Sequence, residues 1–201
     1  DLMVWGDSHA RSILPALDAM AAEKGKSVQV AWYSSTPPVL GYTPEKWLFS
    51  LREEAVPFNQ AVLDHIRLNR VPTVLLAARW STYLPEKPAA SDQRASEFAR
   101  QLTETVRKLK ELDCRVWILS EVPSHHVNVP KALIHKDRFG TDIEPFRSDP
   151  SHLARTTAPF TTLASELRAA GAAVIDVHQR LLDPSSNRFL MEQNGQPLYT
   201  D

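Results

Sequence analysis

A three-layer α/β/α sandwich around a mostly parallel, five-stranded sheet is the fold that this 201-residue sequence predicts. Short apolar runs alternate with longer amphipathic segments along the chain. The apolar runs are nearly continuous, which is typical of parallel strands buried on both faces. The length suffices for one α/β domain with a full core. We therefore expect residues 1–201 to form a single domain.

The predicted strands and helices follow one another in a regular order. The strands are the apolar runs at residues 2–5, 28–33, 73–78, 116–120 and 173–177. Apolar residues recur at helical spacing at residues 12–24, 58–69, 94–112 and 157–170. Residues 34–57 and 121–155 exceed ordinary loop length and read as long loops. Because the sheet is expected to be mostly parallel, functional residues should follow the carboxyl ends of its strands.

Composition narrows the possible partners. The formal net charge is −1, and no basic stripe favours nucleic acid or an anionic membrane surface. Every apolar run is shorter than about 18 residues, so no membrane span or signal peptide is predicted. The chain begins at Asp1 without an initiator methionine, and we expect it to be excised from a longer protein. The single cysteine, Cys114, is expected to be a small core residue.

The segment that carries the most chemistry is Gly6, Asp7 and Ser8, at the end of the first predicted strand. Gly6 permits a tight turn, and Ser8 then lies near a helix N-terminus, where backbone N–H groups can stabilise an oxyanion. This is the geometry of a serine nucleophile. Asp7 or Ser8 can equally serve as a helix cap, and the spacing alone leaves both possibilities open.

The extended block at residues 6–10, Gly-Asp-Ser-His-Ala, resembles the first motif of the SGNH (GDSL-like) hydrolase superfamily. It is most similar to the branch fused behind the membrane acyltransferase domain of bacterial enzymes that O-acetylate surface polysaccharides. The resemblance covers nearly the whole chain, through residues 35–38 (Ser-Thr-Pro-Pro), 74–80 (Val-Leu-Leu-Ala-Ala-Arg-Trp), 121–123 (Glu-Val-Pro) and 195–201 (Gly-Gln-Pro-Leu-Tyr-Thr-Asp).

The resemblance implies a set of catalytic roles. Ser8 is the nucleophile, and Gly41 is the counterpart of a glycine that helps the Ser8 N–H bind the oxyanion. SGNH enzymes place an Asp-x-x-His pair after the last strand, which makes Asp201 the orienting carboxylate and puts the histidine base just beyond the given chain. Arg79 and Trp80 stand where other SGNH enzymes carry an asparagine donor, so that donor is unassigned.

Two further substrate contacts are expected at the end of the third strand. Arg79 is suited to hold an anionic or hydroxyl-rich substrate, and Trp80 to stack on a sugar ring. The alternatives are an Arg79 paired with a structural carboxylate and a Trp80 packed in the core.

Other histidines offer competing sites. Asp149 and His152 have the Asp-x-x-His spacing, but they precede the helix and strand that should come before the catalytic loop, and they are the stronger alternative. His178 follows Asp176 at an apolar strand end, where a structural histidine is commoner. His9, His125 and His126 lack the spacing of a zinc site, so no metal is predicted.

The resemblance implies a serine-dependent O-acyltransferase domain that moves acetyl to a sugar hydroxyl of a lipopolysaccharide or related glycan, without a cofactor. A fused membrane domain would deliver the acetyl donor, and the domain would lie at the periplasmic face of the bacterial inner membrane. A free-standing carbohydrate esterase or deacetylase with the same triad is one alternative. An inactive glycan-binding module is another.

Overall fold

The computed structural model describes residues 1–44, 49–84 and 93–199. The chain divides into two compact units. Unit one comprises residues 1–121 and 158–175, and unit two comprises residues 122–157 and 176–201. Each unit is described by itself below.

Unit one is built on a five-stranded parallel sheet with the order β2-β1-β3-β4-β5. This confirms the predicted fold class, and each predicted strand is present within two residues of its expected bounds. Gly6 pairs in register with both Trp32 and Ala77, so β1, β2 and β3 end together at one edge of the sheet. The strands are β1 (Leu2–Gly6), β2 (Val28–Trp32), β3 (Thr73–Ala77), β4 (Arg115–Leu119) and β5 (Ala172–Ile175).

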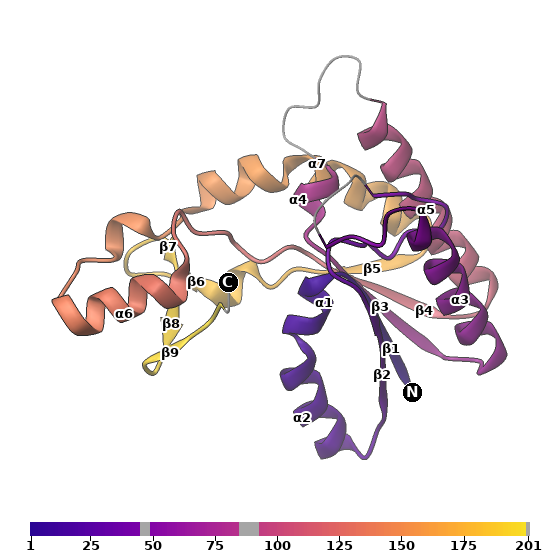
Figure 1. Cartoon of the computed structure of the whole chain (residues 1–201), viewed down its shortest axis with the longest axis horizontal. Coiled ribbons are helices and arrows are strands. Elements are labelled where there is room, and N and C mark those ends of the chain that lie inside the picture. The colour runs from indigo at the N-terminus through magenta and orange to yellow at the C-terminus, as the bar shows by residue number, and fades with distance from the viewer. Residues whose placement is uncertain (45–48, 85–92, 200–201) are drawn as a thin grey trace. The chain divides into compact units, whose positions relative to one another are not determined.

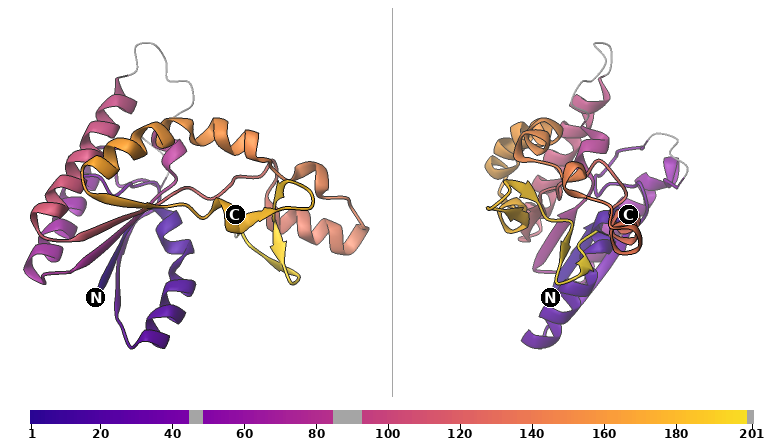
Figure 2. Two further views of the ribbon diagram at one scale, coloured as in Figure 1. Left: turned by 180° about the vertical axis from the view of Figure 1, so that it is seen from behind. Right: turned by 90° about the vertical axis from the view of Figure 1, so that its left-hand side faces the viewer.

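The two faces of this sheet are covered by different helices, as Figures 1 and 2 show. Side chains alternate between the faces along each strand. Trp5, Leu76 and Ile118 point to the face that packs against α3, α5 and residues 158–169 of α7. Val4 and Ala77 point to the opposite face, beneath α1 and α2. The helices are α1 (Ser8–Ser12), α2 (Leu14–Lys24), α3 (Ala55–Leu68), α5 (Arg94–Glu111) and α7 (Pro150–Ala169).

The first helix begins earlier than the predicted residue 12. Helix α1 starts at Ser8, because the Asp7 carboxylate accepts a hydrogen bond from the His9 backbone N–H at 2.8 Å and so caps the helix. Helix α1 ends at its C-cap, Ile13, and α2 then starts with a proline in its first turn. The turn that carries Ser8 is therefore helical from its first residue.

The long segment after β2 is tied to the core by a buried asparagine. The Asn59 amide nitrogen donates to the carbonyl oxygens of Pro37 (3.0 Å) and Val39 (2.9 Å). The indole nitrogen of Trp5 donates to Asn59 Oδ1 at 2.9 Å, and Asn59 is fully buried on α3. Because each buried polar atom has a partner, this network holds the loop leading to Gly41 in one conformation.

Unit two corrects the expectation of one long loop at residues 121–155. Helix α6 (Val129–Phe139) lies within this segment, capped by Asn128 and terminated by Gly140 at φ 63°. Helix α7 also begins at Pro150, seven residues before its predicted start. The unit further contains η2 (Glu144–Phe146), α8 (His178–Leu181) and the short hairpins β6 (Leu182–Asp183) with β7 (Arg188–Phe189) and β8 (Glu192–Gln193) with β9 (Gln196–Pro197).

A buried arginine organises unit two. The Arg147 guanidinium makes two bonds to the Glu144 carboxylate at 2.7 and 2.8 Å and one to Asp183 at 3.1 Å. It also donates to the Phe189 carbonyl at 3.0 Å. Arg147 therefore joins η2 to the β6–β7 hairpin, which explains how a unit with little regular structure keeps a defined form.

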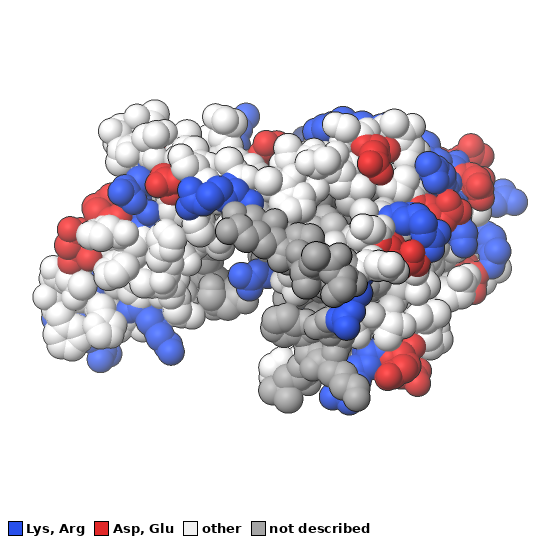
Figure 3. Space-filling view, turned by 90° about the horizontal axis from the view of Figure 1, so that it is seen from above, with Lys and Arg blue, Asp and Glu red and all other residues white. Residues whose placement is uncertain are grey.

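The surface carries charges of both signs. On the face seen in Figure 3, acidic and basic side chains are interspersed, which agrees with the formal net charge of −1. Among the residues that the structure describes, no helix is both long and apolar enough to cross a membrane.

Candidate active site

Gly6 brings the end of β1 against the end of β3. A Cβ atom at this position would lie 1.7 Å from the Ala77 carbonyl oxygen and 2.9 Å from the Ala10 Cβ. Both distances are far below a van der Waals contact, so no residue with a side chain fits without a backbone shift. Strand β1 ends at this close approach, and the turn that carries Ser8 follows it directly.

Asp7 is the buried anchor of that turn, with 2% of its surface exposed. Its Oδ1 atom caps α1 through the His9 N–H. Its Oδ2 atom accepts hydrogen bonds from the Arg79 backbone N–H and from the Tyr83 hydroxyl, each at 3.0 Å. Asp7 thus ties the end of β1 to the segment after β3, across 72 residues of sequence.

These contacts show which residue caps the helix. Asp7 performs the capping, so Ser8 is not needed for it. Ser8 is exposed at the helix start, and its hydroxyl forms no hydrogen bond with any residue that the structure describes. An exposed hydroxyl at a helix N-terminus, with the structural role taken by its neighbour, is what a serine nucleophile requires.

Tyr83 is a buried hydrogen-bond partner of Asp7 that the sequence did not reveal. Burial and the adjacent Asp7 carboxylate raise the pKa of its phenol well above its usual value, so the hydroxyl stays protonated and donates to Asp7. It belongs to the four-residue helix α4 (Trp80–Tyr83), which no sequence pattern predicts. Only its distance to Asp7 in the folded chain indicates the role.

We expect Tyr83→Phe to lower the rate of acyl transfer about three- to tenfold and the free energy of unfolding by about 1 kcal/mol, because one buried hydrogen bond to Asp7 is lost. Stopped-flow turnover of an acetyl ester, together with urea unfolding, measures both effects. A positioning role predicts a lower kcat with an unchanged KM. An unchanged kcat in a destabilised variant would show that Tyr83 serves stability alone.

Arg79 and Glu121 lie together at the same sheet edge. The Arg79 side chain is 56% exposed, and its Nε atom lies 3.8 Å from Glu121 Oε1. Glu121 is buried and accepts two hydrogen bonds from Ser81, from the backbone N–H and the hydroxyl, each at 2.7 Å. Arg79 therefore lies beside a structural carboxylate, which is one of the two possibilities that the sequence left open. The guanidinium also remains exposed, so a substrate contact stays a prediction.

Trp80 is a core residue, and its predicted stacking on a sugar ring is wrong. The side chain is fully buried, and its indole nitrogen donates to the Leu119 carbonyl at 2.7 Å. Its ring lies on that of Phe160, with 5.4 Å between the centroids and 13° between the planes. A ring covered in this way presents no face to a substrate.

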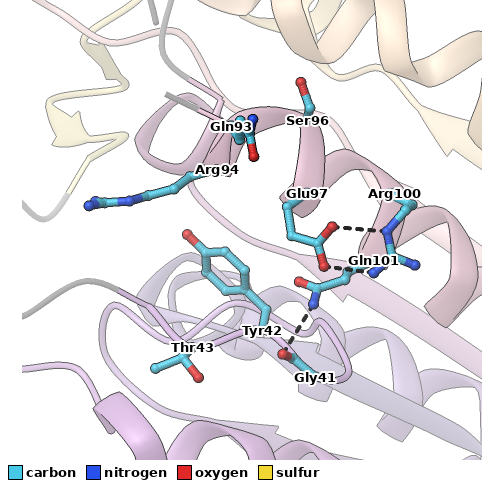
Figure 4. A pocket seen from close by; sticks show the side chains of 9 residues that line it. All are labelled: Gly41, Tyr42, Thr43, Gln93, Arg94, Ser96, Glu97, Arg100 and Gln101. Atoms are coloured by element: carbon cyan, nitrogen blue, oxygen red, sulfur yellow. Dashed lines mark hydrogen bonds and ion pairs between the residues drawn. The ribbon is translucent and has the colours of Figure 1, made fainter. Parts of the chain in front are cut away.

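Gly41 follows the anchored loop after β2, with φ at 72°. Its carbonyl accepts a hydrogen bond from the Gln101 side-chain amide of α5 at 3.1 Å. Gly41 is exposed and lines a surface pocket, shown in Figure 4. Its predicted oxyanion role remains a prediction, and Asp201, the predicted orienting carboxylate, lies outside the described residues.

The two competing Asp–His pairs lie in unit two and differ in geometry. The Asp149 carboxylate accepts from the His152 backbone N–H at 2.8 Å, in the manner of a helix cap for α7. The Asp176 carboxylate also accepts from a backbone N–H, that of His178, and it lies 2.9 Å from His178 Nδ1. Contact with Nδ1 is the arrangement of a catalytic carboxylate. On geometry, the Asp176 pair is therefore the stronger of these two alternatives.

The loop histidines at residues 125 and 126 have different surroundings. His125 Nδ1 accepts a hydrogen bond from the Ser148 N–H at 3.2 Å, and its ring packs edge-on against Tyr199. The exposed His126 ring lies 4.6 Å from that of His152. In the part of the chain that is described, no three His, Cys, Asp or Glu side chains gather as a possible metal site.

Burial lowers the pKa of His125 from 6.5 to about 4. Between about pH 6.5 and pH 4, His125 therefore binds a proton in the unfolded chain but not in the folded chain. The free energy of unfolding should fall as the pH falls through this window. We expect His125→Asn, which keeps an acceptor for the Ser148 N–H, to lessen this acid sensitivity. Thermal melts from pH 7 to pH 4 measure it, with His135→Asn on exposed α6 as control. Equal acid sensitivity in both variants would contradict the assignment.

The comparison with protein families decides the identity of the fold. Residues 1–201 match the family described as "SGNH domain (fused to AT3 domains)". The chain belongs to this SGNH family. The match confirms the resemblance of the Gly-Asp-Ser-His-Ala block and its companion segments. The match runs from Asp1 to Asp201.

Solved structures share the fold of this SGNH domain. The periplasmic domain of a lipopolysaccharide acetyltransferase from Salmonella ser. Paratyphi A aligns with a TM-score of 0.69 at 17% identity, over 98% of this chain and 72% of that one. A GDSL-like lipase from Bacteroides thetaiotaomicron gives 0.52 at 8% identity, over 98% and 78%. TesA gives 0.52 at 13% identity, over 98% and 88%. No curated protein matches the sequence.

Proposed function

We propose that this SGNH domain transfers an acetyl group, through Ser8, to a sugar hydroxyl of a bacterial cell-surface polysaccharide. The observation that carries the proposal is the exposed Ser8 hydroxyl at the start of α1, next to a buried Asp7 that performs the capping. The family's fusion to AT3 domains, and the structural likeness to a lipopolysaccharide acetyltransferase domain, support acyl transfer on a glycan.

The chemistry proceeds in two steps. A histidine base removes the proton from Ser8 Oγ, which attacks the acetyl carbonyl, and the backbone N–H groups of Ser8 and Gly41 receive the oxyanion. The C–O or C–S bond to the donor breaks, and the donor group takes the proton. A sugar hydroxyl then gives its proton to the base and attacks the acetyl-serine. The bond between the acetyl carbon and Ser8 Oγ breaks, and the base returns the proton to Ser8 Oγ. Asp201 orients the base. No cofactor is required.

The family's fusion to AT3 domains supports a proposal for the partner and the location. A fused membrane acyltransferase domain supplies the acetyl donor, and this SGNH domain acts at the periplasmic face of the inner membrane. Arg79, with an exposed guanidinium at the sheet edge beside Glu121, is placed to contact the acceptor glycan. A free-standing esterase would use the same Ser8, with water in place of the sugar hydroxyl.

The test is to trap the acetyl-enzyme. The chain, extended by about 30 native residues to include a closing helix, is mixed with p-nitrophenyl acetate, quenched in acid and digested for mass spectrometry. The proposal expects one added acetyl group on the peptide that contains Ser8. Acetylation at another side chain, with Ser8 unlabelled, would overturn the proposal.

Transfer and hydrolysis are separated in the full-length protein. With radiolabelled acetyl donor in membranes, a transferase moves the label into polysaccharide, whereas an esterase releases acetate at the same rate with or without glycan. Full polysaccharide acetylation by the Ser8→Ala protein would favour a non-catalytic glycan-binding module instead.

A further inference from the structure

A pocket of about 720 Å³ opens beside the loop that leaves β2. Its volume falls within the range of about 300–1,000 Å³ that is usual for ligand sites. One wall is the loop, and the other is the first two turns of α5, so both walls belong to unit one. Figure 4 shows the lining residues: Gly41, Tyr42, Thr43, Gln93, Arg94, Ser96, Glu97, Arg100 and Gln101.

The side-chain amide of Gln101 places a buried acceptor, its Oε1 atom, in this wall. Its amide nitrogen is committed to the Gly41 carbonyl, because a carbonyl can only accept. The Gln101 Oε1 atom is buried, and no residue that the structure describes donates a hydrogen bond to it. A buried unpaired acceptor costs about 1–3 kcal/mol, which a bound hydroxyl group would recover. The pocket wall is therefore suited to a ligand that donates O–H groups.

The remaining lining groups have the same preference. In Figure 4 the Tyr42 hydroxyl points toward the side of the pocket that holds Gln93 and Arg94. Thr43 and Ser96 add hydroxyl groups, and an aromatic ring among short polar side chains is suited to contact a sugar. Glu97 and Arg100 neutralise one another through two hydrogen bonds of 2.6 and 2.9 Å. The wall thus lacks the concentrated charge of a phosphate site.

Packing contacts join the pocket to Asp7, the residue before Ser8. Gly41, the proposed oxyanion donor, forms part of its wall. The Tyr42 ring lies edge-on to Tyr83, with 6.2 Å between centroids, and the Tyr83 hydroxyl bonds to Asp7, the residue before Ser8. Two side-chain contacts therefore separate the pocket from the catalytic turn.

From these contacts we infer that the pocket is the acceptor subsite, which holds a sugar unit of the glycan chain next to the unit that receives acetyl at Ser8. This rests on the proposed function for the identity of the glycan. The site takes a neutral or weakly acidic oligosaccharide, recognised by Gln101 Oε1, the hydroxyl groups and the Tyr42 ring. The acetyl donor does not use it.

The test fills the pocket and measures glycan binding. Oligosaccharides released from the lipopolysaccharide of the source bacterium and freed of acetyl esters are titrated into the 201-residue chain, with chemical shifts as readout. Ser96 is exposed on α5, so Ser96→Trp adds bulk to the pocket without entering the core. Arg107→Trp, at an exposed site on the same helix outside the pocket, is the matched control. We expect Kd to rise at least tenfold in Ser96→Trp and to stay unchanged in Arg107→Trp.

An equal Kd in Ser96→Trp and the parent chain would overturn the inference, and so would the absence of binding to the parent chain. The acetyl-serine assay separates this failure from failure of the proposed function. The parent chain should acetylate Ser8 from p-nitrophenyl acetate, and so should Arg107→Trp, which lies outside the pocket. Glycan binding in the pocket without any Ser8 labelling would retain the subsite and reject the catalytic proposal.

Discussion

Replacing Ser8 with alanine should lower acetyl transfer by at least about 10³-fold, because removal of a nucleophile leaves only binding and oxyanion stabilisation. The fold should be unaffected, since Ser8 is exposed and Asp7 retains the capping hydrogen bond to the His9 N–H. The rate is measured with the extended chain on p-nitrophenyl acetate and with the full-length protein on polysaccharide. Circular dichroism and urea unfolding verify that the variant is folded.

Ser12→Ala is the matched control for this experiment. Ser12 lies in the same helix, and its hydroxyl donates only to the His9 carbonyl at 2.8 Å. The control should keep nearly full activity, because no catalytic group is removed. If Ser8→Ala retained the parent rate in both assays, Ser8 would not be the nucleophile. The Asp–His pairs of unit two would then be the next residues to test.

Gly6→Ala should lower the free energy of unfolding much more than Gly25→Ala. The new Cβ would lie 1.7 Å from the Ala77 carbonyl oxygen and 2.8 Å from the Ala77 carbonyl carbon, so β1 and β3 must separate where they end. Backbone atoms cannot rotate away as a flexible side chain can. We expect a loss of at least about 4 kcal/mol in the free energy of unfolding, a large share of the usual 5–15 kcal/mol.

Urea unfolding followed by circular dichroism measures this loss, with Gly25→Ala as the control. Gly25 ends α2 at φ 60°, and nothing lies within 4 Å of the position its Cβ would take. Only the left-handed backbone opposes alanine there, at a cost of about 1 kcal/mol. Similar losses in the two variants would show that the contact between Gly6 and Ala77 is looser than the structure indicates.

Local sequence patterns were sufficient for most of the α/β framework. Each strand is an apolar run whose burial follows from its own residues, and α5 carries its apolar stripe at Leu102, Val106 and Leu109. The turn at Gly6, Asp7 and Ser8 is equally local, because a tight turn, a cap and a helix start involve neighbouring residues. The family and the position of Ser8 were therefore accessible from sequence.

Interactions between distant residues could not be derived in this way. Residues 129–139 form α6 although no clear apolar stripe marks them, and its buried Val129 packs against Ile143 and Met191. For Trp80, the sequence allowed either exposure to a sugar or burial. The choice depends on Phe160, which lies 80 residues away, and no single-sequence pattern reports that contact.

The sequence by itself thus determined the order of strands and helices along the chain, the SGNH resemblance and the nucleophile candidate. These features depend on neighbouring residues and short-range periodicity. Only the tertiary structure showed that Asp7 rather than Ser8 forms the hydrogen bonds that hold the turn. It also showed that Tyr83 donates a hydrogen bond to Asp7, and that Gly41 lines a pocket together with α5. Each of these depends on hydrogen bonds or packing between segments 60 or more residues apart, which only the folded chain brings together.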